Sequence, residues 1–212
     1  MNAKPAGIQI ISAIGAVMAW TAVMLQLYLI MVNRLASVPE TLLRFFTFFT
    51  ILCNILAAVC FTALSIKPRF GNGNFFSRPG VLSAVTIYIA IVGIVYQLIL
   101  RPLWDPQGLQ KIVDELLHSV MPAYCILFWH LYVPKLTLRW QHIFRWLVFP
   151  LCYLVIILLR GAVSGYYPYP FVNVSVLGYG KVFLNCGMLL VAFLFFSVLV
   201  VAVGRFSKKH AD

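Results

Sequence analysis

A stripe of polar side chains runs along the apolar stretch that ends near residue 66. Its members follow one another at steps of four, three, three and four residues, and they are Glu40, Arg44, Thr47, Thr50 and Asn54. Because an α-helix turns by about 100° per residue, these positions share one face of a predicted helix. A threonine hydroxyl on such a face becomes a nucleophile when a neighbouring base removes its proton. The alternative is that threonine and asparagine only hydrogen-bond neighbouring helices within a membrane.

A histidine with a carboxylate one helical turn before it lies further along the chain. Asp114, His118 and Pro122 are spaced by four residues, so they share a face of a second predicted helix. Imidazole is the most common base for activating a hydroxyl, and a carboxylate one turn away can pair with it or bias its protonation. Together the two helices predict an acyl-transfer site, with Thr47 as nucleophile, Thr50 as the alternative nucleophile and His118 as general base.

Acyl transfer also needs groups that stabilise the negative charge developing on the carbonyl oxygen. The candidates are Asn54, Arg44 and Arg160, and the sequence does not choose among them. Guanidinium groups also hold carboxylates and phosphates, so Arg44 and Arg160 are candidate anchors for an anionic end of a substrate. The alternative is that both arginines extend to lipid headgroups.

The elements that carry these residues are predicted to be membrane-spanning helices. The 212-residue chain is 63% hydrophobic and 10% charged, whereas a soluble domain typically carries about 25% charged residues. Six apolar runs are long enough to cross a bilayer as helices, at residues 7–32, 41–66, 81–100, 111–133, 142–163 and 181–204. The first run is too long for a signal peptide, so we expect it to be retained. The expected fold is an all-α integral membrane protein with one domain of six helices over residues 1–212.

The net charge of +11 indicates membrane topology and not nucleic-acid binding, because the basic residues lie at the ends of the apolar runs. With six spans, one side holds Lys4, Lys67, Arg69, Arg78, Lys135, Arg139, Arg145, Arg205, Lys208 and Lys209. The other side holds Arg34, Arg44, Arg101, Lys111, Arg160 and Lys181, with the acids Glu40, Asp105, Asp114 and Glu115. Because lysine and arginine favour the cytoplasmic side, both termini are predicted to be cytoplasmic and residues 164–180 external.

The depth of the candidate residues indicates where a substrate would bind. Thr47 and His118 lie about six and seven residues inside the outer ends of their runs, which places both about 10 Å below the outer interface. Polar residues gather in this outer half, which favours a pocket over a path across the cell membrane. The expected partners are therefore membrane lipids and a lipid or fatty-acid ester substrate. The alternatives are a non-enzymatic transporter and a structural membrane protein.

The five cysteines predict neither a disulfide nor a metal site. They lie inside apolar runs, no two form a CxxC pair, and they are Cys53, Cys60, Cys125, Cys152 and Cys186. Such cysteines behave as small buried hydrophobic residues. The sequence also contains no phosphate-binding loop and no dinucleotide fingerprint, so we expect no cofactor.

Three segments resemble the androgen-induced-protein and TFPI-regulating-protein family, including its bacterial six-span relatives. They are RFFTFFTILCN from Arg44, LLHSVMP from Leu116 and GYYPYPFVNV from Gly165. The resemblance implies a multi-pass threonine hydrolase that cleaves fatty acid esters of hydroxy fatty acids. It also implies Thr47 as the nucleophile and His118 as the second catalytic residue. The spacing from this histidine to the following proline is one residue shorter than in the eukaryotic members.

Overall fold

Long α-helices make up nearly all of the chain. The computed structural model describes the backbone of residues 5–71 and 74–209, and side chains up to Arg205, so the predicted topology residue Lys4 and the side chains of Lys208 and Lys209 lie outside it. No strand occurs in the described ranges. Among the described residues, six helices are long and apolar enough to cross a membrane, at Pro5–Val32, Phe49–Ile66, Pro79–Leu103, Gly108–Tyr132, Gln141–Ser164 and Val174–Arg205. The predicted all-α class with six membrane-spanning helices is therefore confirmed.

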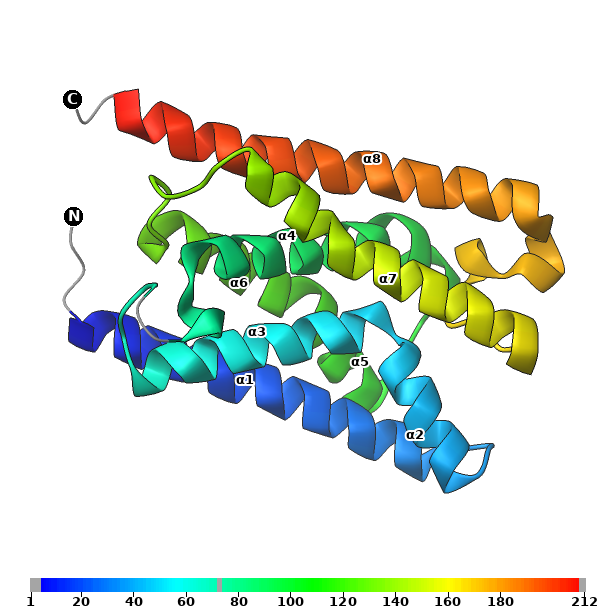
Figure 1. Ribbon diagram of the computed structural model, residues 1–212. Coiled ribbons are helices and arrows are strands. Elements are labelled where there is room, and N and C mark those ends of the chain that lie inside the picture. Colours follow the sequence, from blue (N-terminus) through cyan, green and yellow to red (C-terminus); the bar gives the residue numbers. More distant parts are fainter. Residues whose placement is uncertain (1–4, 72–73, 210–212) are drawn as a thin grey trace. The chain divides into compact units, whose positions relative to one another are not determined.

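The chain divides into two compact units, residues 1–137 and 138–212, so the predicted single domain stays a prediction. In the first unit, α1 packs along α3, and both α3 and α6 pack against α4 (Figure 1). The helices of this unit are α1 (Pro5–Val32), α2 (Val38–Thr47), α3 (Phe49–Ile66), α4 (Pro79–Val95), α5 (Gly108–Glu115) and α6 (Met121–Tyr132).

A break at Phe48 divides the stretch that was predicted to be one helix over residues 41–66. Phe48 is extended, with φ −79° and ψ 120°, so α2 ends at Thr47 and α3 begins at Phe49. The Thr47 hydroxyl donates to the backbone carbonyl of Arg44 over 2.6 Å. Such side-chain bonds to nearby carbonyls compete with the helical pattern, and the surrounding phenylalanines are weak helix formers. The polar stripe is therefore not one continuous helix face.

Two π-helical turns interrupt the helices that flank the candidate histidine. They are η2 (Tyr96–Leu100), which continues α4, and η4 (Leu116–Val120), which joins α5 to α6. Each turn is followed within two residues by a proline, Pro102 or Pro122. Proline has no backbone N–H, so it cannot donate to the carbonyl four residues earlier as other helical residues do. Beside Pro122, the Met121 N–H donates instead to the carbonyl of Leu116, five residues earlier, which is the hydrogen bond of a π-helix. π-Turns of this kind are frequent at functional sites.

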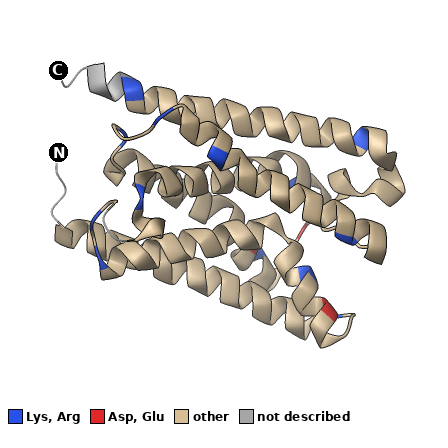
Figure 2. Ribbon diagram, in the orientation of Figure 1, with Lys and Arg blue, Asp and Glu red and all other residues tan. Residues whose placement is uncertain are grey.

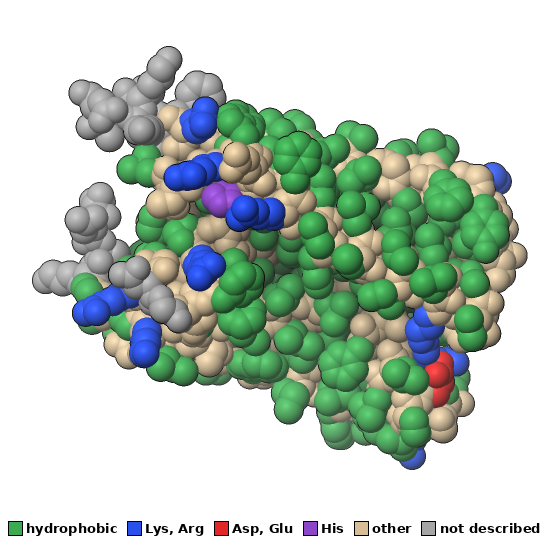
Figure 3. Space-filling model, in the orientation of Figure 1, with side chains coloured by type: hydrophobic (Ala, Val, Ile, Leu, Met, Phe, Trp, Pro, Cys, Tyr) green, Lys and Arg blue, Asp and Glu red, His purple; other side chains and the backbone are tan. Residues whose placement is uncertain are grey.

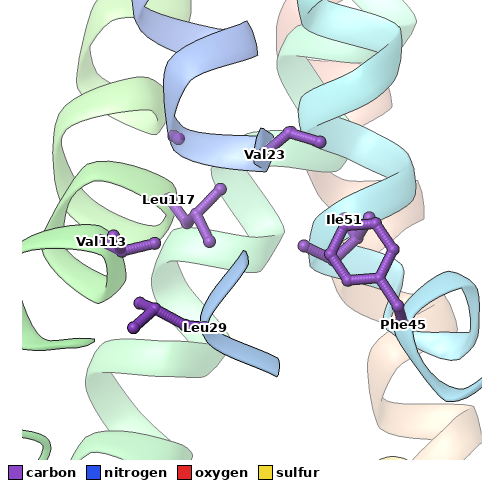
Figure 4. Packing of buried hydrophobic residues seen from close by; sticks show 7 residues of the cluster. Val23, Leu29, Phe45, Ile51, Val113 and Leu117 are labelled. Atoms are coloured by element: carbon purple, nitrogen blue, oxygen red, sulfur yellow. The ribbon is translucent and has the colours of Figure 1, made fainter. Parts of the chain in front are cut away.

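A buried apolar cluster fixes α1, α2 and α3 against α5 and η4 near these turns. Its residues are Ala22, Val23, Leu29, Phe45, Ile51, Val113 and Leu117. Figure 4 shows Phe45 and Ile51 together, with Leu117 and Val113 opposite them. Ile51 follows Thr50 in the chain and Leu117 precedes His118, so this packing holds both candidate residues through their neighbours.

The second unit contains α7 (Gln141–Ser164) and α8 (Val174–Lys209), which are joined through the short 3₁₀ turn η5 (Pro170–Val172). Helix α7 is capped after Ser164 by Gly165, which has a left-handed backbone (φ 69°) and donates its N–H to the carbonyl of Gly161 over 2.8 Å. Helix α8 begins seven residues earlier than the predicted span and contains a kink at Gly178 (φ 72°). Ile157, Val172, Val182 and Cys186 form the buried cluster of this unit.

Basic side chains lie toward both ends of each unit (Figure 2). In the first unit, Lys67, Arg69, Arg78 and Lys135 lie at the end opposite to the acids of α2 and α5. In the second unit, Arg139, Arg145 and Arg205 lie at the end opposite to Arg160 and Lys181. The helices expose many large apolar side chains, which dominate the face drawn in Figure 3, as expected for contact with lipid.

Candidate functional site: a threonine and a histidine between two membrane helices

Thr50 and His118 face each other in the first unit. The Thr50 Oγ1 atom lies 3.3 Å from His118 Nε2, within hydrogen-bond distance. Thr50 belongs to the first turn of α3, and its side chain is 7% exposed. His118 lies in the π-turn η4 and is mostly buried. The structure therefore brings the histidine to the threonine that the sequence offered as the alternative nucleophile.

The hydrogen bond of His118 Nδ1 determines which imidazole nitrogen carries the proton. His118 Nδ1 lies 2.9 Å from the backbone carbonyl oxygen of Asp114. A carbonyl oxygen can only accept, so in the neutral imidazole Nδ1 carries the proton and donates to it. Nε2 is then the unprotonated nitrogen, and the Thr50 hydroxyl donates to it. This is the orientation that a general base requires.

Asp114 stands behind the imidazole, as the four-residue spacing predicts. Its Oδ1 atom is 3.8 Å from His118 Nδ1, and its side chain is buried. A carboxylate at this distance stabilises the positive charge that the imidazole gains when it takes a proton. Asp114 is therefore well placed to support a general base, although it does not touch Thr50 in this arrangement.

Tyr96 completes the cluster, and the sequence analysis did not identify it. Its hydroxyl donates to Asp114 Oδ2 over 2.8 Å, and its ring stacks on the His118 imidazole with centroids 4.1 Å apart and planes 14° from parallel. The side chain is 3% exposed. In the sequence, Tyr96 is one aromatic residue in an apolar run, and no spacing connects it to a partner on another helix.

Thr47, the first-choice nucleophile, lies on the other side of the helix break. It is the last residue of α2, and its hydroxyl donates to the Arg44 carbonyl. Arg44 in turn pairs with Glu40 one turn earlier, with 2.8 Å between Nε and Oε1. The expected helix face that would have joined Thr47 to Thr50 is interrupted at Phe48, so the two threonines have different surroundings.

Asn54 joins the two sides of the site instead of pointing a donor toward a substrate. Its Nδ2 atom donates to the carbonyl of Thr50 over 2.9 Å and to the carbonyl of Leu117 over 3.4 Å. The side chain is fully buried, and both amide hydrogens are used in these bonds. In this structure both hydrogens donate to backbone carbonyls, and the predicted role of Asn54 as a source of oxyanion donors stays a prediction.

Arg160, the remaining candidate, belongs to the second unit. Its guanidinium carbon lies 5.2 Å from the centroid of the Tyr166 ring, a cation–π contact within the same unit. Its predicted role in binding an anionic substrate stays a prediction.

A second polar cluster ties the two π-turns together next to the site. Gln97 donates to Ser119 over 2.8 Å, and Ser119 donates to Glu115 over 2.6 Å. Arg101 donates to both Gln97 and Glu115, each over 2.6 Å. These four side chains form a closed ring of hydrogen bonds. Gln97 of η2 and Ser119 of η4 belong to it, so the ring joins the turn that carries Tyr96 to the turn that carries His118.

No group of three or more histidine, cysteine, aspartate or glutamate side chains in residues 5–71 and 74–209 could hold a metal ion. The five cysteines are free thiols, and four of them are buried.

The fold and the site define a multi-pass α-helical membrane protein with a buried threonine–histidine pair. Comparison with protein-family models, with curated proteins and with solved structures finds no match. Its function is therefore inferred from the chemistry of this pair.

Proposed function

We propose that the protein is an intramembrane hydrolase of lipid esters, with Thr50 as nucleophile and His118 as general base. The observation that carries the proposal is the 3.3 Å contact between Thr50 Oγ1 and His118 Nε2, the nitrogen that has no proton when Nδ1 donates to the Asp114 carbonyl. A hydroxyl is a weak nucleophile at its own pKa, and an adjacent base is the usual means of activating it. The family resemblance supports the same reaction, although it matches Thr47, whereas the contact favours Thr50.

The first half of the proposed reaction transfers the acyl group to the protein. Thr50 Oγ1 attacks the ester carbonyl carbon while His118 Nε2 takes the hydroxyl proton. The bond between the carbonyl carbon and the alcohol oxygen then breaks, and the imidazolium returns the proton to the leaving alcohol. The product of this step is an acyl ester of Thr50.

The second half releases the acyl group with water. A water molecule attacks the acyl-threonine carbonyl while His118 Nε2 takes one of its protons. The bond to Thr50 Oγ1 breaks, the threonine regains a proton from the imidazolium, and a carboxylic acid leaves. Both halves use the same histidine in the same orientation.

Two features of the site favour the charges that form during these steps. Thr50 lies in the first turn of the 18-residue helix α3, where the aligned peptide dipoles create a partial positive charge. This end of the helix favours the negative charge on the attacked carbonyl oxygen. The Asp114 carboxylate, 3.8 Å from Nδ1, favours the imidazolium.

The position of Thr50 supports a lipid as the substrate. Thr50 is the second residue of a membrane-spanning helix, close to where the apolar stretch ends. An ester that binds at this level can keep its acyl chain among apolar side chains. In keeping with the Lys/Arg distribution, we place both termini in the cytoplasm and the site toward the outer side of the cell membrane.

Labelling with a fluorophosphonate probe tests the proposal, because such a probe forms a covalent bond with an activated hydroxyl. The purified wild-type protein should be labelled on Thr50, and the labelled peptide can be identified by mass spectrometry. Thr50→Ala and His118→Ala should abolish labelling. Thr47→Ala should keep it, as should the control Thr62→Ala, whose hydroxyl on the same helix contacts Trp20 and the Ala58 carbonyl.

Two results would count against the proposal. Absence of labelling in the folded wild-type protein would contradict the proposed hydrolase activity. Loss of labelling in Thr47→Ala with retention in Thr50→Ala would move the nucleophile to Thr47, against the geometry.

A further inference from the structure

We infer that Tyr96 is a positioning residue that holds His118 and Asp114 in their working orientation. The inference rests on the proposed function, since it concerns the same histidine. Tyr96 acts through these two side chains and neither transfers the proton nor attacks the ester, so its role is distinct from those of Thr50 and His118.

The argument begins with the two simultaneous contacts of one side chain. The Tyr96 hydroxyl donates to Asp114 Oδ2 over 2.8 Å, while its ring covers a face of the His118 imidazole at 4.1 Å between centroids. Asp114 and His118 lie one turn apart on a single helical segment, and Tyr96 reaches them from a different one. One side chain therefore sets the relative orientation of both.

These contacts restrict the motions that would misdirect the base. An imidazole can rotate about its bond to Cβ, which would move Nε2 away from Thr50. The Tyr96 ring lies nearly parallel to the imidazole, with 14° between the two planes, and blocks this rotation on one face. The hydrogen bond from Nδ1 to the Asp114 carbonyl restrains the imidazole further. In the same way, the hydroxyl holds Oδ2, so that Oδ1 remains directed toward Nδ1.

Tyr96 also favours the charged form of the histidine that exists only during the reaction. The face of a phenol ring carries partial negative charge, which attracts a cation placed over it. The imidazole becomes a cation only when it has taken the proton of the nucleophile. The contact is therefore stronger in the transition state than before the reaction, and such a contact raises kcat without changing KM.

The backbone around Tyr96 is arranged to bring the ring this close. Tyr96 is the first residue of the π-turn η2, and it is 3% exposed. Three residues earlier in the chain is Gly93. A Cβ atom at this position would lie 3.1 Å from the carbonyl oxygen of His118. The absence of a side chain lets α4 approach η4 closely, which places the tyrosine ring over the imidazole.

The test compares Tyr96→Phe and Tyr96→Leu with wild type, using turnover of a long-chain ester and the rate of fluorophosphonate labelling. Tyr96→Phe keeps the ring and removes one oxygen atom, so we expect kcat to fall about tenfold with KM unchanged within about twofold. Tyr96→Leu also removes the ring, so we expect kcat to fall about a hundredfold. The labelling rate should fall in the same order.

Tyr124→Phe is the matched control, because it removes another tyrosine hydroxyl that joins two helices of the same unit. The Tyr124 hydroxyl donates to the carbonyl of Ile11, away from the threonine–histidine pair. Its loss should lower the melting temperature in detergent and leave kcat and the labelling rate at wild-type values. A purely structural role for Tyr96 predicts the same outcome for Tyr96→Phe.

The outcomes separate the inference from the proposed function. If Tyr96→Phe, folded by its melting curve, matches wild type in kcat while Thr50→Ala and His118→Ala are inactive, the inference is wrong and the hydrolase stands. A rise in KM with kcat unchanged would also overturn it, since that result places Tyr96 in substrate binding. If the folded wild-type protein neither turns over esters nor reacts with the probe, both fail.

Discussion

Gly93 lies directly against the backbone carbonyl of His118, so closely that a Cβ at this position would be 3.1 Å from the carbonyl oxygen and 3.1 Å from the Cβ of Pro122. Neither neighbour can move easily, because one belongs to the backbone and the other to a rigid ring. The two helical segments must therefore separate to accept any side chain at residue 93. The contact links the packing of α4 to the position of the histidine.

Gly93→Ala should consequently impair both stability and chemistry. Overpacking of this kind typically costs about 1–3 kcal/mol, and a displacement of His118 by a fraction of an ångström should lower kcat about tenfold or more. Thermal unfolding in detergent and ester turnover measure the two effects. Gly187→Ala is the control, because a Cβ there has no heavy atom within 4 Å, and it should behave like wild type. Wild-type kcat in Gly93→Ala would show that the close approach does not matter for the site.

The histidine can be tested by chemical rescue. His118→Ala removes the base and leaves a space beside Thr50 that free imidazole fits, so turnover should fall by about a thousandfold and recover partly when imidazole is added. Thr50→Ala should show no recovery, because it lacks the hydroxyl that imidazole would activate. Equal recovery in both variants would mean that imidazole cleaves the ester by itself, and the assignment of His118 as the base would lose its support.

Some of this arrangement could be predicted from the sequence, because it depends on residues close together in one helix. The apolar runs predict the six long helices, and the four-residue spacing of Asp114 and His118 predicts that the carboxylate stands behind the imidazole. Local periodicity is sufficient for both, since each helical turn fixes the neighbours along its own face.

The rest depends on contacts between helices and on irregular backbone. Phe48 interrupts the helix between Thr47 and Thr50, so one continuous helix face does not relate the two threonines, and periodicity cannot show that Thr50 meets His118. Tyr96 meets Asp114 across eighteen residues of sequence; Tyr96 begins the π-turn η2, and Asp114 lies two residues before the π-turn η4. Periodicity assumes regular α-helix, so it cannot predict pairs that form where the helices depart from it.

Membrane topology can be tested with single cysteines and an impermeant thiol reagent. Ser164→Cys places a thiol of similar size at an exposed position at the end of α7, and the Lys/Arg distribution predicts that it reacts in intact cells. Thr137→Cys, exposed in the loop before α7, should react only after permeabilisation. The background is Cys152→Ser, which removes the one exposed native cysteine. The reversed pattern would place both termini outside and contradict the proposed topology.

The substrate class can be tested by comparing esters that differ in chain length and charge. Thr50 begins an apolar membrane span, so a substrate must enter the membrane to reach it, and long-chain esters should be turned over faster than short soluble ones. Arg44 lies near this end of α3, on the amphipathic helix α2, where its guanidinium could hold a carboxylate. Arg44→Ala should therefore raise KM about fivefold for a long-chain ester with a free carboxylate.

The same long-chain ester with its carboxylate methylated is the matched control, and its KM should be equal for wild type and Arg44→Ala. Arg44→Lys keeps the positive charge but not the planar pair of donors, so its KM should lie between the two. Arg160→Ala extends the test to the other candidate anchor. Faster turnover of short esters would exclude a lipid substrate. If neither Arg44→Ala nor Arg160→Ala changes KM for the anionic ester, the carboxylate binds elsewhere. The proposed roles of Thr50 and His118 would stand, because neither depends on the charged end of the substrate.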